Sequence, residues 1–170
     1  MPIRDRLPPI PADQMTAEQK AAAEAIIKGP RGHLVGPFLV LLRSPEFMNR
    51  LQRTGEYLRF NSALPPRLSE LAILLTARVW SQGFEWHHHR IIAEKAGLSS
   101  AIIDAIAEGR RPDAMADDEA AVHDFIAELH RNRTVSEPTY QKALALFGEK
   151  GIVDMTGISG YYSMLAMLMN

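Results

Sequence analysis

The sequence contains no cysteine, and this absence excludes several kinds of chemistry. Disulfide bonds, thiol nucleophiles, zinc fingers and cysteine-ligated iron–sulfur clusters all require thiol groups. No uninterrupted apolar run approaches the roughly 18 residues of a membrane span. The opening segment, MPIRDRLPPIP, lacks the apolar core of a signal peptide. The sequence therefore predicts a cytoplasmic protein that does not span a membrane.

An excess of one charge is also missing. The chain has 19 Lys and Arg residues against 20 Asp and Glu residues, and its basic residues are dispersed, so we expect no nucleic-acid partner. A length of 170 residues predicts one domain spanning 1–170. Four prolines within residues 1–13 favour an extended N-terminal arm over a helix.

Alternating apolar and polar residues of useful length are absent, so no strand is expected. Helical periodicity, N-cap residues and Gly or Pro stops instead predict an all-α protein of about eight helices. The expected helices span Ala17–Lys28, a short buried helix that holds the apolar run Phe38–Leu42 and ends at Arg43, Pro45–Phe60, a central helix from about Arg67 to Ser81, a helix that follows a break at Gly83, Ser100–Glu108, Asp117–Asn132, Pro138–Phe147 and Gly148–Met169.

Residues 68–97, LSELAILLTARVWSQGFEWHHHRIIAEKAG, hold most of the candidate chemistry. The first part is apolar on nearly every side of a helical wheel, which is typical of a helix buried all round. Only Glu70 and Arg78 carry charge on it. Because a buried lone carboxylate is costly, Glu70 needs a partner, a proton or a function. A purely structural role for Glu70 remains open at this point.

The second part of this stretch predicts a helix with one histidine of three facing the core. On its wheel, His89 lies at the centre of the apolar face and Glu85, four residues earlier, lies at its edge. His87 lies off this apolar face. Ionisable groups on a buried face favour perturbed pKa values and acid–base catalysis.

A metal site is the competing interpretation of these histidines. Glu85 and His88 match the Glu-x-x-His spacing of di-iron bundles, but such sites need two copies and further glutamates, and the sequence has one copy. Neighbouring residues on a helix diverge by about 100°, so three consecutive histidines cannot bind one ion. We therefore predict no metal. A second pair at this spacing, Glu119 and His123, is interpreted as a surface pair.

This stretch resembles the carboxymuconolactone decarboxylase family, which shares its fold with the AhpD-type alkylhydroperoxidases. The similar residues are SELAIL with Glu70, the AR at Ala77–Arg78, FEW at Phe84–Trp86, then His89, Ala93 and AGLS at Ala96–Ser99. An apolar GYYSMLAM near the C-terminus is also familiar from such proteins. The resemblance implies an all-α, AhpD-like fold in a bacterial protein.

The resemblance also identifies a departure from the peroxidase branch. That branch carries a Glu, a Cys-x-x-Cys pair and a His four residues after the second Cys. Glu70 and His89 match its Glu and His, but Gln82 and Glu85 occupy the two cysteine positions. The chain therefore resembles the cysteine-free, decarboxylase-like branch, with the pattern Glu-Trp-x-x-His, and we expect no thiol peroxidase activity.

The function implied by the resemblance is cofactor-free decarboxylation of a small cyclic carboxylate or lactone. It implies that His89 donates a proton, that Glu85 orients His89 or shuttles protons, and that Glu70 lies behind them. Arg78 and Arg43 are candidates for binding the substrate carboxylate, although Arg78 is equally well explained as a structural partner of a core carboxylate.

Trp86 is a further substrate-binding candidate, and a homo-oligomer is expected from the proline-rich arm and the Met-rich C-terminal helix. Two alternative functions remain open. One is a cysteine-free protein of the AhpD or peroxiredoxin class that acts on another substrate, and the other is a protein that only binds a ligand.

Overall fold

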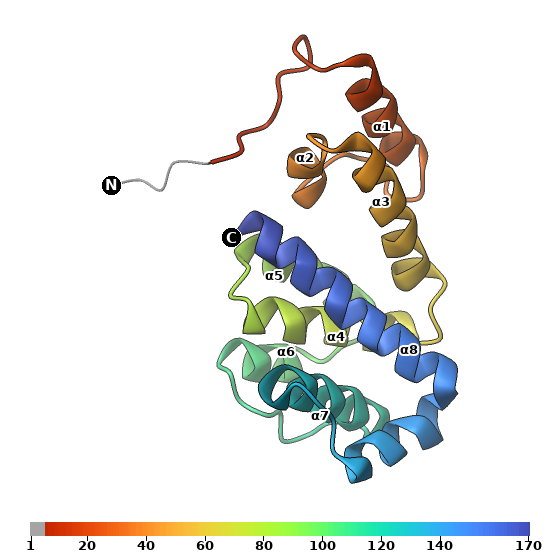
Figure 1. Cartoon of the computed structure of the whole chain (residues 1–170). Helices are drawn as coiled ribbons and strands as arrows, with labels where there is room; N and C mark the ends of the chain where they lie inside the picture. Colours follow the sequence, from red (N-terminus) through yellow and green to blue (C-terminus); the bar gives the residue numbers. More distant parts are fainter. Residues whose placement is uncertain (1–5) are drawn as a thin grey trace. The chain divides into compact units, whose positions relative to one another are not determined.

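The computed structural model describes residues 6–170, which form eight helices and no strand (Figure 1). The all-α prediction is confirmed. Residues 1–5 of the expected N-terminal arm lie outside the described residues, and residues 6–13 contain no helix. None of the helices in the described part is long and apolar enough to cross a membrane.

The described part of the chain folds as two compact units, residues 6–56 with Met169, and residues 57–168 with Asn170. The first unit contains α1 (Ala17–Lys28), α2 (Pro37–Leu41) and most of α3 (Pro45–Phe60). Thr16 caps α1 in a reciprocal capping box with Gln19, which satisfies two backbone donors at the start of the helix.

The second unit contains the end of α3 and five further helices. They are α4 (Pro66–Val79), α5 (Gly83–Lys95), α6 (Ser100–Ala107), α7 (Asp117–Asn132) and α8 (Glu137–Met169). Helix α4 packs against α5, α6 and α7, and ten of its residues, from Leu68 to Ala77, are buried. The prediction of a helix buried on most sides is confirmed over this range, because neighbours surround it.

The junction between α4 and α5 differs from the expected break at Gly83. Helix α4 ends at Val79, Ser81 adopts a positive φ of 51°, and Gly83 is already the first residue of α5. Gln82 caps α5, because its Oε1 accepts from the backbone N–H groups of Phe84 at 2.7 Å and Glu85 at 3.1 Å. This cap fixes the first turn of α5, which carries Glu85.

Helix α8 contains a kink at Gly148, where φ is 65° and ψ is 179°. Glycine tolerates this backbone conformation because it has no Cβ. The kink lies between the two helical segments that the sequence predicts, 138–147 and 148–169. The later segment carries Tyr161 and Tyr162 into the core, where both are buried.

Candidate functional site

Three ionisable side chains from two helices meet in the core of the second unit. Glu70 comes from the first half of α4, and Glu85 and His89 come from α5. Each is between 2 and 3 % exposed. The helical wheel of α5 is confirmed, because His89 is buried while His87 is exposed.

The imidazole of His89 lies between the two carboxyl groups. Its Nδ1 is 2.6 Å from Glu70 Oε2, and its Nε2 is 3.3 Å from Glu85 Oε2. Burial alone would lower the pKa of His89, but the bonds with Glu70 and Glu85 raise it above the ordinary value of 6.5. We conclude that the structure favours the protonated imidazolium, which donates toward both carboxylates.

One carboxylate oxygen of this group is left without a bond. Glu85 Oε1 is buried and has no hydrogen-bond partner among residues 6–170. An unsatisfied carboxylate oxygen in a buried position costs free energy. A ligand that supplies a hydrogen-bond donor to Oε1 would remove that cost.

Tyr162 of α8 covers the imidazole. Its ring meets that of His89 edge to face, with centroids 5.0 Å apart. Burial raises the pKa of Tyr162 well above 10.0, and the charges of Glu70 and Glu85 raise it further. The phenol therefore stays protonated and does not act as a base at neutral pH.

A neutral histidine and an arginine complete the charged surroundings. Burial lowers the pKa of His88, and the positive charges of His89 and Arg59 lower it further. Arg59 also acts on the phenol of Tyr162, because its charge works against the rise in the pKa of that group. Sequence patterns miss Arg59 and Tyr162 as neighbours of this site, since they lie on α3 and α8, outside residues 68–97.

Two of the proposed substrate-binding residues, Arg78 and Trp86, line a cavity to which the three acid–base side chains do not contribute. The cavity has a volume of about 280 Å³, lies near the start of α5 and is also lined by Gln82. This cavity remains a candidate for substrate binding.

The expectation that Arg78 is buried is wrong. The residue is exposed and its Nε donates to the carbonyl of Ala107 at 2.9 Å, because the last turn of α4 extends past the packed core. Arg43 belongs to the first unit, where its Nη2 donates to the carbonyl of Pro8 at 2.5 Å. Its role in binding substrate stays a prediction.

The interpretation of Glu119 and His123 as a surface pair is also wrong. Both are 7 % exposed. Glu119 bonds to Arg67 of α4, and His123 Nδ1 lies 2.9 Å from Asp124 Oδ1. Neighbours from α4 and from the segment before α7 cover a face that the sequence of α7 alone suggests is solvated.

The described residues include no group of three or more His, Asp or Glu side chains arranged to hold a metal ion. Comparison with curated proteins finds no match to the chain. Residues 45–127 match the model of the carboxymuconolactone decarboxylase family, and this range includes Glu70, Glu85 and His89. This segment is therefore similar to the carboxymuconolactone decarboxylase family, and the chain that carries it contains no cysteine.

Proposed function

We propose that this protein is a carboxy-lyase that removes CO2 from a small cyclic carboxylate or lactone without a cofactor. One observation carries the proposal: the buried imidazole of His89 has a carboxyl group at each ring nitrogen, and the outer carboxyl group, Glu85, has an unbonded oxygen. This arrangement can hold a proton in the core and release it at a defined atom.

The chemistry of such a substrate matches what these side chains offer. When the carbon–carbon bond to the carboxylate breaks, CO2 leaves and the electron pair passes through a conjugated double bond onto the lactone carbonyl. The substrate is therefore its own electron sink. The enzyme must stabilise the dienolate oxygen and deliver one proton to carbon.

The proton has a path in this arrangement. Glu85 Oε1 faces no protein donor, so we assign it the contact with the substrate carbon. His89 transfers its Nε2 proton to Glu85, which becomes a neutral carboxylic acid while His89 becomes a neutral imidazole. Rotation of this carboxyl group presents its O–H to the substrate carbon, which takes the proton and leaves Glu85 as a carboxylate again. Glu70 stabilises the positive charge of His89 from the other side. His89 is thus the source of the proton and Glu85 is the shuttle.

The substrate carboxylate needs a cation, and the chain offers several. Arg78 and Arg43 are the candidates from the sequence. Arg59 is a third, because its charge reaches His88 and Tyr162 beside the imidazole. Replacing each arginine singly by glutamine and measuring KM distinguishes them, and an unchanged KM removes that residue from the assignment.

The test of the proposal is CO2 release from a panel of lactone carboxylates and β-keto acids. We expect turnover of at least one compound by the unaltered protein, loss of turnover in His89→Ala, and retention of most turnover in His87→Ala, the matched control on the exposed side of α5. Absence of CO2 with every compound, or equal losses in the two variants, would contradict the proposal. Ligand-induced stabilisation without turnover would favour a binding protein instead.

We also propose that the protein is a homo-oligomer in the cytoplasm. Large apolar side chains are exposed on the second unit, among them Val79 at 54 %, Ile91 at 43 % and Met167 at 56 %. Where such side chains gather into one contiguous patch, they are typical of a surface that packs against a partner. Light scattering at micromolar concentration tests this, and a monomer mass would refute it.

A further inference from the structure

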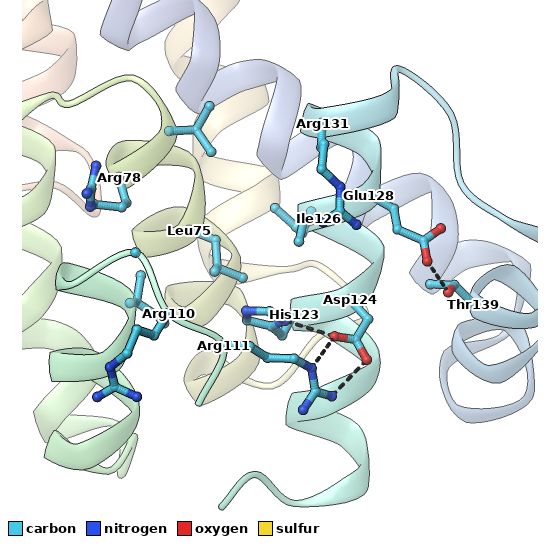
Figure 2. Close-up of a pocket in the computed structure, with 14 residues that line it drawn as sticks. Leu75, Arg78, Arg110, Arg111, His123, Asp124, Ile126, Glu128, Arg131 and Thr139 are labelled. Atoms are coloured by element: carbon cyan, nitrogen blue, oxygen red, sulfur yellow. Dashed lines mark hydrogen bonds and ion pairs between the residues drawn. The ribbon is translucent and has the colours of Figure 1, made fainter. Parts of the chain in front are cut away.

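A second cavity lies in the same unit, between α4 and α7. Its volume is about 360 Å³, within the range of small-molecule sites. Figure 2 shows its walls, with Leu75 on one side, Ile126 on α7, and His123 below them. Its lining includes none of the three acid–base side chains Glu70, Glu85 and His89.

The lining combines an apolar floor with an excess of positive charge. Leu75, Val79, Ile106 and Ile126 contribute the apolar surface, while the charged residues are four arginines and two carboxylates. His123 apart, the lining therefore carries two more positive than negative charges.

The two carboxylates are already occupied by protein partners. Asp124 accepts two hydrogen bonds from Arg111, each 2.9 Å long, and the bond to Arg111 lowers the pKa of Asp124. Glu128 accepts from Thr139 at 2.6 Å and from the backbone N–H of Ser136 at 2.7 Å. Neither carboxylate neutralises the remaining arginines by a direct bond.

Arg131 is the arginine best placed to receive a ligand. It forms no hydrogen bond within residues 6–170, although its charge helps to lower the pKa of the neighbouring Glu128. In Figure 2 its side chain extends along α7 to the vicinity of Ile126. Two other arginines are engaged, because Arg110 bonds to Glu108 at 2.5 Å and Arg78 Nε bonds to Ala107.

His123 adds a second polar contact. Its Nδ1 is joined to Asp124 Oδ1, which leaves Nε2 for a ligand on the side of the ring away from Asp124 (Figure 2). In the protonated form, Nε2–H would donate to an anionic oxygen.

We propose that this cavity binds a small organic carboxylate with an apolar body, at a site separate from the acid–base group. The carboxylate pairs with Arg131 and approaches His123 Nε2, and the apolar body lies over Leu75 and Ile126. A fully inorganic anion leaves the apolar floor uncovered, and a neutral compound leaves Arg131 unpaired.

The test is titration of the protein with benzoate, benzamide and inorganic phosphate, followed by ¹⁵N–¹H NMR and calorimetry. We expect benzoate to bind saturably, with amide shifts concentrated in residues 105–111 and 123–131. Benzamide and phosphate should bind more weakly by about tenfold or more, because each lacks one of the two interactions. Shifts centred on α5, or phosphate binding as tightly as benzoate, would overturn the proposal.

Two variants separate charge from shape. Arg131→Gln removes the unpaired guanidinium and should weaken benzoate binding by about tenfold. Ala127→Phe fills part of the cavity without changing its charge and should abolish binding. Arg53→Gln is the matched control, because it makes the same charge change at an exposed residue that does not line the cavity.

The decisive outcomes are independent of the carboxy-lyase proposal. Equal weakening in Arg131→Gln and Arg53→Gln would show that only overall charge matters, and benzoate binding unaffected by Ala127→Phe would show that the probe binds elsewhere; either result would overturn the cavity site. Neither result depends on turnover, so the cavity site and the acid–base group can fail separately.

Discussion

Two buried histidines of the same unit lie beside carboxylates, yet their surroundings differ in charge and access. His89 lies between Glu70 and Glu85, so carboxyl groups outnumber the one base. His123 bonds to a single carboxylate, Asp124, which is itself held by an arginine. The first group is buried in the core, and His123 lines a cavity.

The difference shows that the number of charged partners decides what a buried histidine can do. Two carboxyl groups hold a proton on an imidazole against the cost of burial, because charges interact more strongly where water is excluded. That arrangement suits proton transfer. Next to an excess of arginines, a histidine instead contributes to a site for an anion.

The largest difference between the regions should appear in turnover. Glu70→Gln preserves size and most hydrogen bonding but removes the charge beside His89 Nδ1. We expect turnover to fall by about 10²–10⁴, as for other lost acid–base groups, while the fold stays close to that of the unaltered protein. Asp124→Asn, the equivalent change in the cavity, should leave turnover per folded molecule within about twofold.

Thermal melts decide between a catalytic and a structural role for Glu70. If Glu70 only supports the fold, Glu70→Gln should lose several kcal/mol of stability, as broken buried pairs do. A large fall in Tm with activity per folded molecule intact would therefore remove Glu70 from the proton-transfer group.

The contributions of His89 and Asp124 to the stability of the fold should also change with pH in opposite directions. The pKa of His89 is raised in the folded state, so its contribution to stability is fully present below about 6.5, the unfolded pKa, and is lost as pH rises through the higher folded pKa. The pKa of Asp124 is lowered by its bond to Arg111. Its contribution is present above about 3.9 and is lost as pH falls through the lower folded pKa.

Denaturant unfolding of His89→Gln and Asp124→Asn across pH measures these windows. The stability gap between the unaltered protein and His89→Gln should shrink at alkaline pH, and the gap for Asp124→Asn should shrink at acid pH. Asp124 is 33 % exposed at its side chain, so solvent screens its contribution. If both stability gaps shrank toward the same end of the pH range, the proposed difference between His89 and Asp124 would be contradicted.

Much of the fold follows from local signals in the sequence. Helix α7, for example, has the predicted limits Asp117–Asn132. The orientation of His89 follows from the wheel of α5, because the apolar residues around it define a buried face. The pairing of Glu70 with His89 joins positions 19 residues apart, and spacing on one helix cannot reveal it. The family resemblance supplies that association.

The incorrect predictions of burial for Arg78 and of exposure for His123 have one physical cause. Periodicity gives the direction in which a side chain points, but it does not give the extent of the neighbours that cover it. Arg78 lies on the last turn of α4, beyond the packed core, and is exposed. His123 lies on α7, which packs against α4, and is only 7 % exposed.

The smallest effect on stability and turnover should come from replacing Arg131. This side chain forms no bond within the described residues, so Arg131→Gln should change the free energy of unfolding by less than about 0.5 kcal/mol and leave turnover unaltered. A destabilisation above about 1 kcal/mol would mean that Arg131 supports the fold, and it would remove the cation that the cavity offers to a ligand.

The protonation state of His89 tests the proton-transfer account most directly. ¹⁵N NMR of the imidazole, followed from about pH 5 to about pH 9 on either side of the ordinary histidine value, reports whether both ring nitrogens carry a proton. We predict that both remain protonated above pH 6.5, the ordinary pKa of histidine, because Glu70 and Glu85 each hold one N–H. A neutral ring that keeps a single N–H across this range, or a midpoint below the ordinary value, would contradict the account.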